Sequence, residues 1–105
     1  MKILVLGTGA QGTTVAKRLD EEPGVSSIIC ADYNTEAVNE LTGILTKAKG
    51  MKCDAYNVDE IINCAQGVDL IVNALPLEFG KNVLDAALAV KANYQDFSSS
   101  NAFDD

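Results

Sequence analysis

Short apolar runs alternate along this chain with longer stretches in which apolar residues recur at helical spacing. The first run, Ile3–Leu6, is continuously apolar and ends at glycines, which is typical of a central strand buried on both faces of a parallel sheet. The remaining predicted strands are Ser27–Ala31, a weaker Met51–Ala55, Asp69–Leu75, which Pro76 ends, and Tyr94–Phe97.

Amphipathic helices are predicted in the segments between these strands. One runs over Thr13–Glu22 and stops at Pro23-Gly24, and a short one covers Asp59–Ala65. Asn34 can cap a helix whose apolar face carries Ala37, Val38, Leu41, Ile44 and Leu45. The last helix follows Gly80, and its apolar face is predicted to carry Val83, Leu84, Ala87 and Leu88.

Strict alternation of strands and helices predicts an α/β fold with right-handed crossovers. We expect a doubly wound, parallel, five-stranded sheet in the order 3-2-1-4-5, with helices on both faces. In such a sheet the ligand crevice opens at the carboxyl ends of strands one and four, where the winding direction reverses. The loops that begin at Gly7 and Ala74 should therefore face each other across that crevice.

The segment Gly7–Gly12 matches the pattern G-x-G-x-x-G between the first strand and the first helix. In this context the glycines provide a tight turn, an unobstructed approach of the backbone to a pyrophosphate, and close packing of helix on strand. Free N–H groups around Gln11, Gly12 and Thr13 would bind the phosphates without any basic side chain. The pattern and its context predict a dinucleotide-binding domain of the Rossmann type.

Asp32 lies twenty positions after Gly12, at the end of the second predicted strand. An acid there can accept hydrogen bonds from the two hydroxyls of the adenosine ribose, whereas the 2′-phosphate of NADP would meet it as a like charge. No Arg or Lys occurs between Asp32 and Lys47, so the chain that follows offers nothing to neutralise an extra phosphate. We therefore expect NAD as the cofactor, with NADP the weaker ligand.

Further candidate contacts follow the third and fourth strands. Asp54, with Ala55, is either an acceptor for the adenine amino group or a solvated acid, and Ala74–Pro76 either touches the dinucleotide or is a structural turn. Tyr33 is either a cofactor contact or a surface aromatic residue. Tyr56 is predicted to be a surface aromatic residue. The predicted cofactor-binding set is Gly7, Thr8, Gly9, Ala10, Gln11, Gly12, Asp32, Tyr33, Asp54, Ala55, Ala74, Leu75 and Pro76. No catalytic or metal-binding residue is predicted.

The composition narrows the possible partners of the chain. A formal charge of −7 over 105 residues, with no basic cluster, disfavours nucleic acid, and histidine is absent. The apolar runs are too short to cross a bilayer and no export signal precedes them, so we expect a soluble, cytoplasmic protein. Cys30, Cys53 and Cys64 have no C-x-x-C spacing and are expected to be buried free thiols.

From Met1 to about Asn101 the chain resembles the amino-terminal domain of the saccharopine dehydrogenase family, which includes lysine 6-dehydrogenase and carboxynorspermidine-forming relatives. The opening I-L-V-L-G-T-G-A-Q-G-T-T-V-A, the segment V-D-L-I-V-N-A-L-P and the ending A-N-Y-Q-D-F-S-S carry the likeness. The resemblance implies that Gly7, Gly9, Gly12, Asp32, Ala74 and Pro76 surround a dinucleotide, and that the ending near Asp96 and Ser98 approaches its nicotinamide side.

The same resemblance implies an oxidoreductase that passes a hydride between the nicotinamide and a carbon bonded to nitrogen in an amino acid. We expect residues 1–97 to form the NAD(P)-binding domain and residues 98–105 to be a tail leading toward a second, substrate-binding domain. The 105-residue piece alone should be inactive, and the parent protein could be a homodimer.

Two other classes remain open from the sequence. One is a non-catalytic NAD-sensing domain of the potassium-transport type, although Cys53 stands where those domains usually have glycine, and Leu75–Leu77 replaces their acidic turn. The other is the amino terminus of an aspartate-semialdehyde- or glyceraldehyde-phosphate-type dehydrogenase, whose catalytic cysteine is missing here.

Overall fold

The computed structural model describes residues 1–96, so the predictions for Phe97, Ser98 and the 98–105 tail lie outside the described residues. The strands are β1 (Lys2–Leu6), β2 (Ser27–Asp32), β3 (Ala48–Lys52), β4 (Leu70–Asn73) and β5 (Asn93–Asp96). The helices are α1 (Ala10–Asp20), α2 (Thr35–Ile44), α3 (Val58–Cys64) and α4 (Gly80–Val90), with a 3-10 turn, η1 (Leu77–Phe79), before α4.

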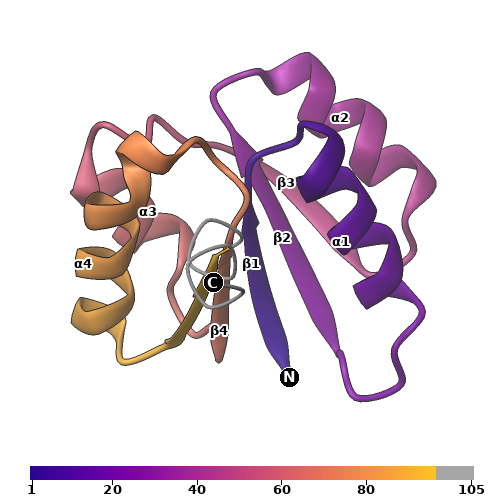
Figure 1. Ribbon diagram of the computed structural model, residues 1–105. Helices are drawn as coiled ribbons and strands as arrows, with labels where there is room; N and C mark the ends of the chain where they lie inside the picture. Colours follow the sequence, from indigo (N-terminus) through magenta and orange to yellow (C-terminus); the bar gives the residue numbers. More distant parts are fainter. Residues whose placement is uncertain (97–105) are drawn as a thin grey trace, which may run out of the picture.

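All five strands are parallel and lie in the order β3-β2-β1-β4-β5, which confirms the predicted topology. Helices α1 and α2 cover one face of the sheet, and α3 and α4 cover the other (Figure 1). The chain therefore reverses its winding direction between β1 and β4. This reversal leaves the carboxyl ends of these strands open to a ligand.

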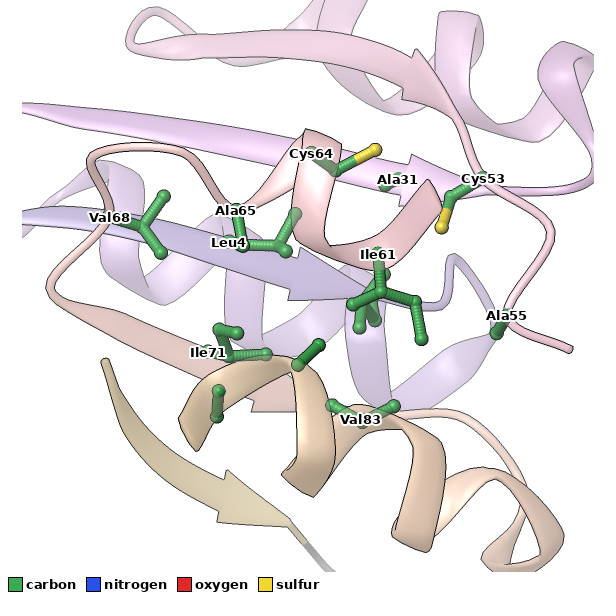
Figure 2. Close-up of a cluster of buried hydrophobic side chains, with 13 residues drawn as sticks. Leu4, Ala31, Cys53, Ala55, Ile61, Cys64, Ala65, Val68, Ile71 and Val83 are labelled. Carbon is green, nitrogen blue, oxygen red and sulfur yellow. The ribbon is translucent and has the colours of Figure 1, made fainter. Parts of the chain in front are cut away.

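Two apolar clusters hold the three layers together. On the α1/α2 face, Ala16 and Leu41 pack against Ile3, Val5 and Cys30 of the sheet. On the other face, Ile61 of α3 and Val83 of α4 point toward Leu4 and Ile71 (Figure 2). The alternation of strand side chains between the two clusters follows from the two-residue period of a β-strand.

The third strand was predicted three residues too late. The sequence pattern favoured Met51–Ala55 because it contains more apolar residues, but β3 is Ala48–Lys52, an edge strand with little buried surface. Gly50 is required within it, since a Cβ at that position would stand 2.4 Å from Cγ1 of Val38. Cys53–Ala55 consequently form a loop at the carboxyl edge of the sheet.

The predicted apolar faces of two helices were wrong in part. Ile44 is 64% exposed at the end of α2, and on α4 Leu84 and Leu88 are 42% and 68% exposed. The buried side chains of α4 are Val83, Ala86 and Ala87. The large leucines suggested the wrong stripe, because small alanines let this helix approach the sheet and α3 closely.

Other predictions about the polypeptide hold. Cys30, Cys53 and Cys64 are free and buried, as expected, and burial raises the pKa of the Cys30 thiol to about 11. Within residues 1–96 no helix is long and apolar enough to cross a membrane. The remaining helices and strands differ from the predicted ranges by a few residues at their ends, where boundaries are least determined by periodicity.

Candidate functional site

A cleft of about 610 Å³ opens at the carboxyl edge of the sheet, where the winding reverses. Its walls come from the turn after β1, the end of β2, and the loops after β3 and β4. The residues that line it are Gly7, Gly9, Asp32, Tyr33, Cys53, Asp54, Ala55, Tyr56, Ala74, Leu75, Pro76 and Phe79. Nine of these are residues predicted from the sequence, so the fold brings distant parts of the predicted set to one cavity.

In the turn after β1, packing within the protein requires glycine at Gly7 and Gly12 but not at Gly9. Gly7 has a φ of 100°, which other residues rarely adopt, and a Cβ there would also stand 2.9 Å from the Ala74 carbonyl oxygen. A Cβ on Gly12 would lie 1.9 Å from the Gly7 carbonyl oxygen. At Gly9 an added Cβ meets nothing within 4 Å, which leaves room for a ligand beside the backbone.

Helix α1 begins at Ala10, three residues earlier than predicted, with Gly9 as its N-cap. The N–H of Thr13 was expected to be free, but it donates to the carbonyl oxygen of Gly9 at 2.9 Å. The N–H groups of Ala10, Gln11 and Gly12 have no acceptor among the described residues. The helix therefore presents three donors and its positive dipole end beside the cleft.

Asp32 ends β2, and the glycine turn holds its carboxylate in place. The Thr8 backbone N–H donates to Oδ2 at 2.8 Å, and the Thr8 hydroxyl donates to the same oxygen at 2.9 Å. The Asn34 N–H donates to Oδ1 at 3.2 Å. Thr8 is thus a positioning residue for Asp32, a role that the sequence pattern did not reveal.

Lys52 lies beside this acid on the neighbouring strand. Asp32 and Lys52 are register partners on adjacent strands, and Nζ of Lys52 stands 4.7 Å from the centre of the Tyr33 ring. The prediction that nothing near Asp32 could neutralise a 2′-phosphate did not take Lys52 into account. It considered only the chain between Asp32 and Lys47, whereas Lys52 arrives from the neighbouring strand.

The loop after β3 forms the second wall of the cleft. Asp54 Oδ1 accepts from the Tyr56 N–H at 3.0 Å, and the Asp54 N–H donates to Glu60 at 3.1 Å. The amide of Asn82 on α4 donates to the Ala55 carbonyl oxygen at 3.0 Å. These bonds fix the loop to the rest of the domain.

Two aromatic rings that were not predicted to belong to the site, those of Tyr56 and Phe79, also line the cleft. The rings of Tyr56 and Phe79 are 4.6 Å apart between centroids and inclined at 55°. The Tyr56 hydroxyl donates to Glu78 at 3.0 Å, and this hydrogen bond raises the pKa of the tyrosine. Only the fold joins these residues, because Tyr56 follows β3 and Phe79 belongs to η1.

Cys53 also lines the cleft and was not predicted to do so. The neighbouring Cys64 thiol and burial raise the pKa of Cys53, so it remains a protonated, apolar wall residue at neutral pH. Among residues 1–96 no group of three or more His, Cys, Asp or Glu is arranged to hold a metal ion. The cleft wall at this point is suited to contact with an apolar ring face.

The loop after β4 crosses beside the glycine turn. The Ala74 N–H donates to the Leu6 carbonyl oxygen at 2.8 Å, and the Leu75 N–H donates to Oδ1 of the buried Asn73 at 3.0 Å. Ala74 and the glycine turn are in direct contact, since an added Cβ on Gly7 or Gly12 would meet Ala74 within 3.4 Å. This packing sets the width of the cleft.

Asp96, placed near the nicotinamide side by the family resemblance, ends β5 outside the described lining of the cleft. It accepts a hydrogen bond from the Tyr94 hydroxyl, which in turn accepts from the Asn73 amide at 3.3 Å. Burial is the largest cause that raises the pKa of Tyr94. This network joins the carboxyl ends of β4 and β5.

Four predicted residues do not themselves line the cleft: Thr8, Ala10, Gln11 and Gly12. Thr8 donates hydrogen bonds to Asp32, and Gly12 packs against Gly7. Ala10 and Gln11 lie at the start of α1. A dinucleotide nevertheless fits the residues present. The space beside Gly9, the free N–H groups of α1 and the carboxylate of Asp32 suit a pyrophosphate and a ribose.

The fold and this cleft define a dinucleotide-binding domain of the Rossmann type. The chain belongs to the family described as the saccharopine dehydrogenase NADP binding domain, whose family model matches residues 3–104. The resemblance seen in the sequence is thereby confirmed, and the family supports binding of a nicotinamide dinucleotide.

Solved structures show the same fold. Apo saccharopine dehydrogenase (L-Glu forming) from Saccharomyces cerevisiae is 18% identical with a TM-score of 0.81, and the match covers 90% of this chain and 21% of that one. A Rossmann-fold NAD(P)-binding family protein from Shigella flexneri is 17% identical (TM-score 0.75; 89% and 49% covered). The NADPH complex of quinone oxidoreductase QOR2 from Escherichia coli is 22% identical with a TM-score of 0.73, and the match covers 86% of this chain and 34% of that one. The chain thus spans about a fifth of the yeast enzyme.

Proposed function

We propose that this chain is the cofactor-binding domain of an oxidoreductase that acts on a C–N bond of an amino acid. The observation that carries the proposal is the convergence of the Gly7–Gly12 turn and Asp32 on one cleft at the winding reversal. Membership of the saccharopine dehydrogenase family supports the reaction class. The substrate then binds to residues beyond this domain, and the 1–97 domain alone is inactive.

The residues of the cleft have distinct parts in this proposal. The α1 N–H groups and the open backbone at Gly9 bind the pyrophosphate, and Asp32 accepts from the adenosine ribose. Asp54, Ala55 and Tyr56 lie against the adenine, while Ala74–Pro76 borders the route toward the nicotinamide ribose. When bound, the nicotinamide ring supplies hydride transfer, and this chain supplies the binding energy that holds it in place.

The choice between NAD and NADP is the finer part of the proposal. The Asp32 carboxylate favours the free 2′-hydroxyl of NAD, because a 2′-phosphate would stand against a like charge. The family is named for NADP, and Lys52 is a cation at the same edge. We therefore propose that NAD binds more tightly, with NADP as a second ligand.

The regulatory alternative is not favoured by the comparisons. The family model that matches residues 3–104 is that of a dehydrogenase domain. A sensing domain of the potassium-transport type would bind the same nucleotides in the same cleft, so binding alone does not separate the two classes. Turnover of an amino acid with NAD by a longer protein that contains this chain would support the proposal of an enzyme. We propose that this longer protein is cytoplasmic and forms a homodimer.

Isothermal titration calorimetry tests whether the cleft recognises the adenosine half of the cofactor. We expect NAD and ADP-ribose to bind with affinities within about tenfold of each other, because most of the proposed contacts of the cleft residues lie on the pyrophosphate and adenosine side. Nicotinamide mononucleotide, which lacks that half, should give no measurable heat. Absence of ADP-ribose binding, or binding of the mononucleotide alone, would contradict the proposal.

A further inference from the structure

Asp32 and Lys52 present opposite charges on the same face of the sheet. They are Cα partners in the parallel register of β2 and β3, and such partners point to the same side. The partners four residues earlier, Ile28 with Ala48, have the same orientation and pack in the α1/α2 cluster, which shows that this side is the α1/α2 face. An acid and a base therefore lie on adjacent strands at the carboxyl edge of the sheet, beside the cleft that Asp32 and Tyr33 line.

The ammonium of Lys52 lies over an aromatic ring and has no carboxylate partner among residues 1–96. Nζ stands 4.7 Å from the centre of the Tyr33 ring, and Tyr33 lines the cleft. In the part of the chain that the structure describes, the ion pair found is that of Lys81 with Asp85, on α4. The cation–π contact orients the ammonium without neutralising it, so its charge is available to an anion.

The carboxylate of Asp32 is already largely occupied by the protein. Oδ2 accepts from the backbone N–H and the hydroxyl of Thr8, and Oδ1 accepts from the Asn34 N–H. A carboxylate offers about four lone-pair positions, so about one remains for the ribose. Asp32 is thus less able to accept from both ribose hydroxyls, and the part of its negative charge that reaches the 2′ position is reduced by these three donors.

We propose that Lys52 is a second specificity-determining residue of the ribose subsite, and that it binds the 2′-phosphate of NADP. The inference rests on the proposed binding of a dinucleotide in this cleft. An ammonium attracts a phosphate as a point charge and tolerates a range of positions, which suits a flexible side chain carried by an exposed edge strand. Lys52 thereby offsets the repulsion from Asp32, and the domain accepts both cofactors.

The test compares ADP-ribose with its 2′-phosphate, two probes that differ only in the group that Lys52 is proposed to bind. We expect Lys52→Gln to weaken the 2′-phosphorylated probe about five- to tenfold, with ADP-ribose changed less than about twofold. For the unsubstituted chain, the affinity for the 2′-phosphorylated probe should also fall more steeply with added salt than the affinity for ADP-ribose. Lys49→Gln is the matched control. Lys49 also lies on β3, but its register partner Ile29 packs on the α3/α4 face, so Lys49 points to the opposite side of the sheet from Lys52.

Equal losses for both probes in Lys52→Gln would overturn the proposal, because Lys52 would then only order Tyr33. An unchanged affinity for the 2′-phosphorylated probe, or no binding of it to the parent chain while ADP-ribose binds, would also overturn it and leave the proposed function standing. If neither probe binds the parent chain, the proposed function fails and the role of Lys52 fails with it.

Discussion

Gly12→Ala is expected to destabilise the domain and weaken dinucleotide binding together. The new Cβ would stand 1.9 Å from the Gly7 carbonyl oxygen, and that atom belongs to backbone that carries a φ of 100°. The turn and the start of α1 must therefore separate. Overpacking of this kind costs about 1–3 kcal/mol of unfolding free energy, and the backbone clash places the expected value at the upper end. Denaturant unfolding and calorimetry with NAD measure both effects.

Two other glycines separate steric strain from ligand contact. Gly43→Ala in α2 meets nothing within 4 Å and should leave binding unchanged while stabilising the helix by about 0.5–1 kcal/mol. Gly9→Ala also meets nothing, so the fold should be retained, yet its methyl group would occupy space proposed for the pyrophosphate. If the Gly12→Ala variant had the same unfolding free energy and the same NAD affinity as the unsubstituted chain, the packing described for the turn would be disproved.

Asp32→Ala is expected to lower NAD affinity about ten- to a hundredfold. The change removes an acceptor proposed for the ribose, and a hydrogen bond to a charged group contributes about 1.5–3 kcal/mol. It also releases both donors of Thr8, which orient the glycine turn. NADP should lose less than NAD, because removal of a like charge near the 2′-phosphate compensates part of the loss.

Thr8→Val is the matched control for that substitution. It removes the hydroxyl bond to Asp32 but keeps the carboxylate and the backbone N–H bond, so the ratio of NAD to NADP affinity should stay near that of the parent chain. Calorimetry with both nucleotides gives this ratio. An Asp32→Ala ratio equal to that of the parent chain would contradict the role assigned to Asp32.

The sequence was sufficient to predict the topology, because alternating strands and helices leave few parallel arrangements. It was insufficient for the edge strand, where Gly50 is required by contact with Val38, and that contact is not visible in a local pattern. The face of α4 was misassigned for a related reason. Leu84 and Leu88 are more hydrophobic than Ala86 and Ala87, but the fit between layers, and not hydrophobicity alone, decides which are buried.

The candidate site was predicted where its residues form a local motif. The Gly7–Gly12 segment and Asp32 have fixed spacing in the chain, so their meeting followed from the motif. Lys52, Tyr56 and Phe79 come from different strands and loops, and only the register of the sheet and the path of the loops bring them to the cleft edge. A search for charges along the chain after Asp32 could not find a cation that approaches across a strand pair.

The measurement that tests the central claim most directly is an NMR titration of the isotope-labelled chain with ADP-ribose. We predict chemical-shift changes in the backbone amides of Gly7–Gly12, Asp32, Tyr33, Asp54 and Leu75, with those at the opposite edge of the sheet, such as Ser27 and Lys49, unchanged. Shifts confined to the opposite edge, or no shifts at saturating ADP-ribose, would contradict the account of this cleft as the adenosine and pyrophosphate half of a dinucleotide site.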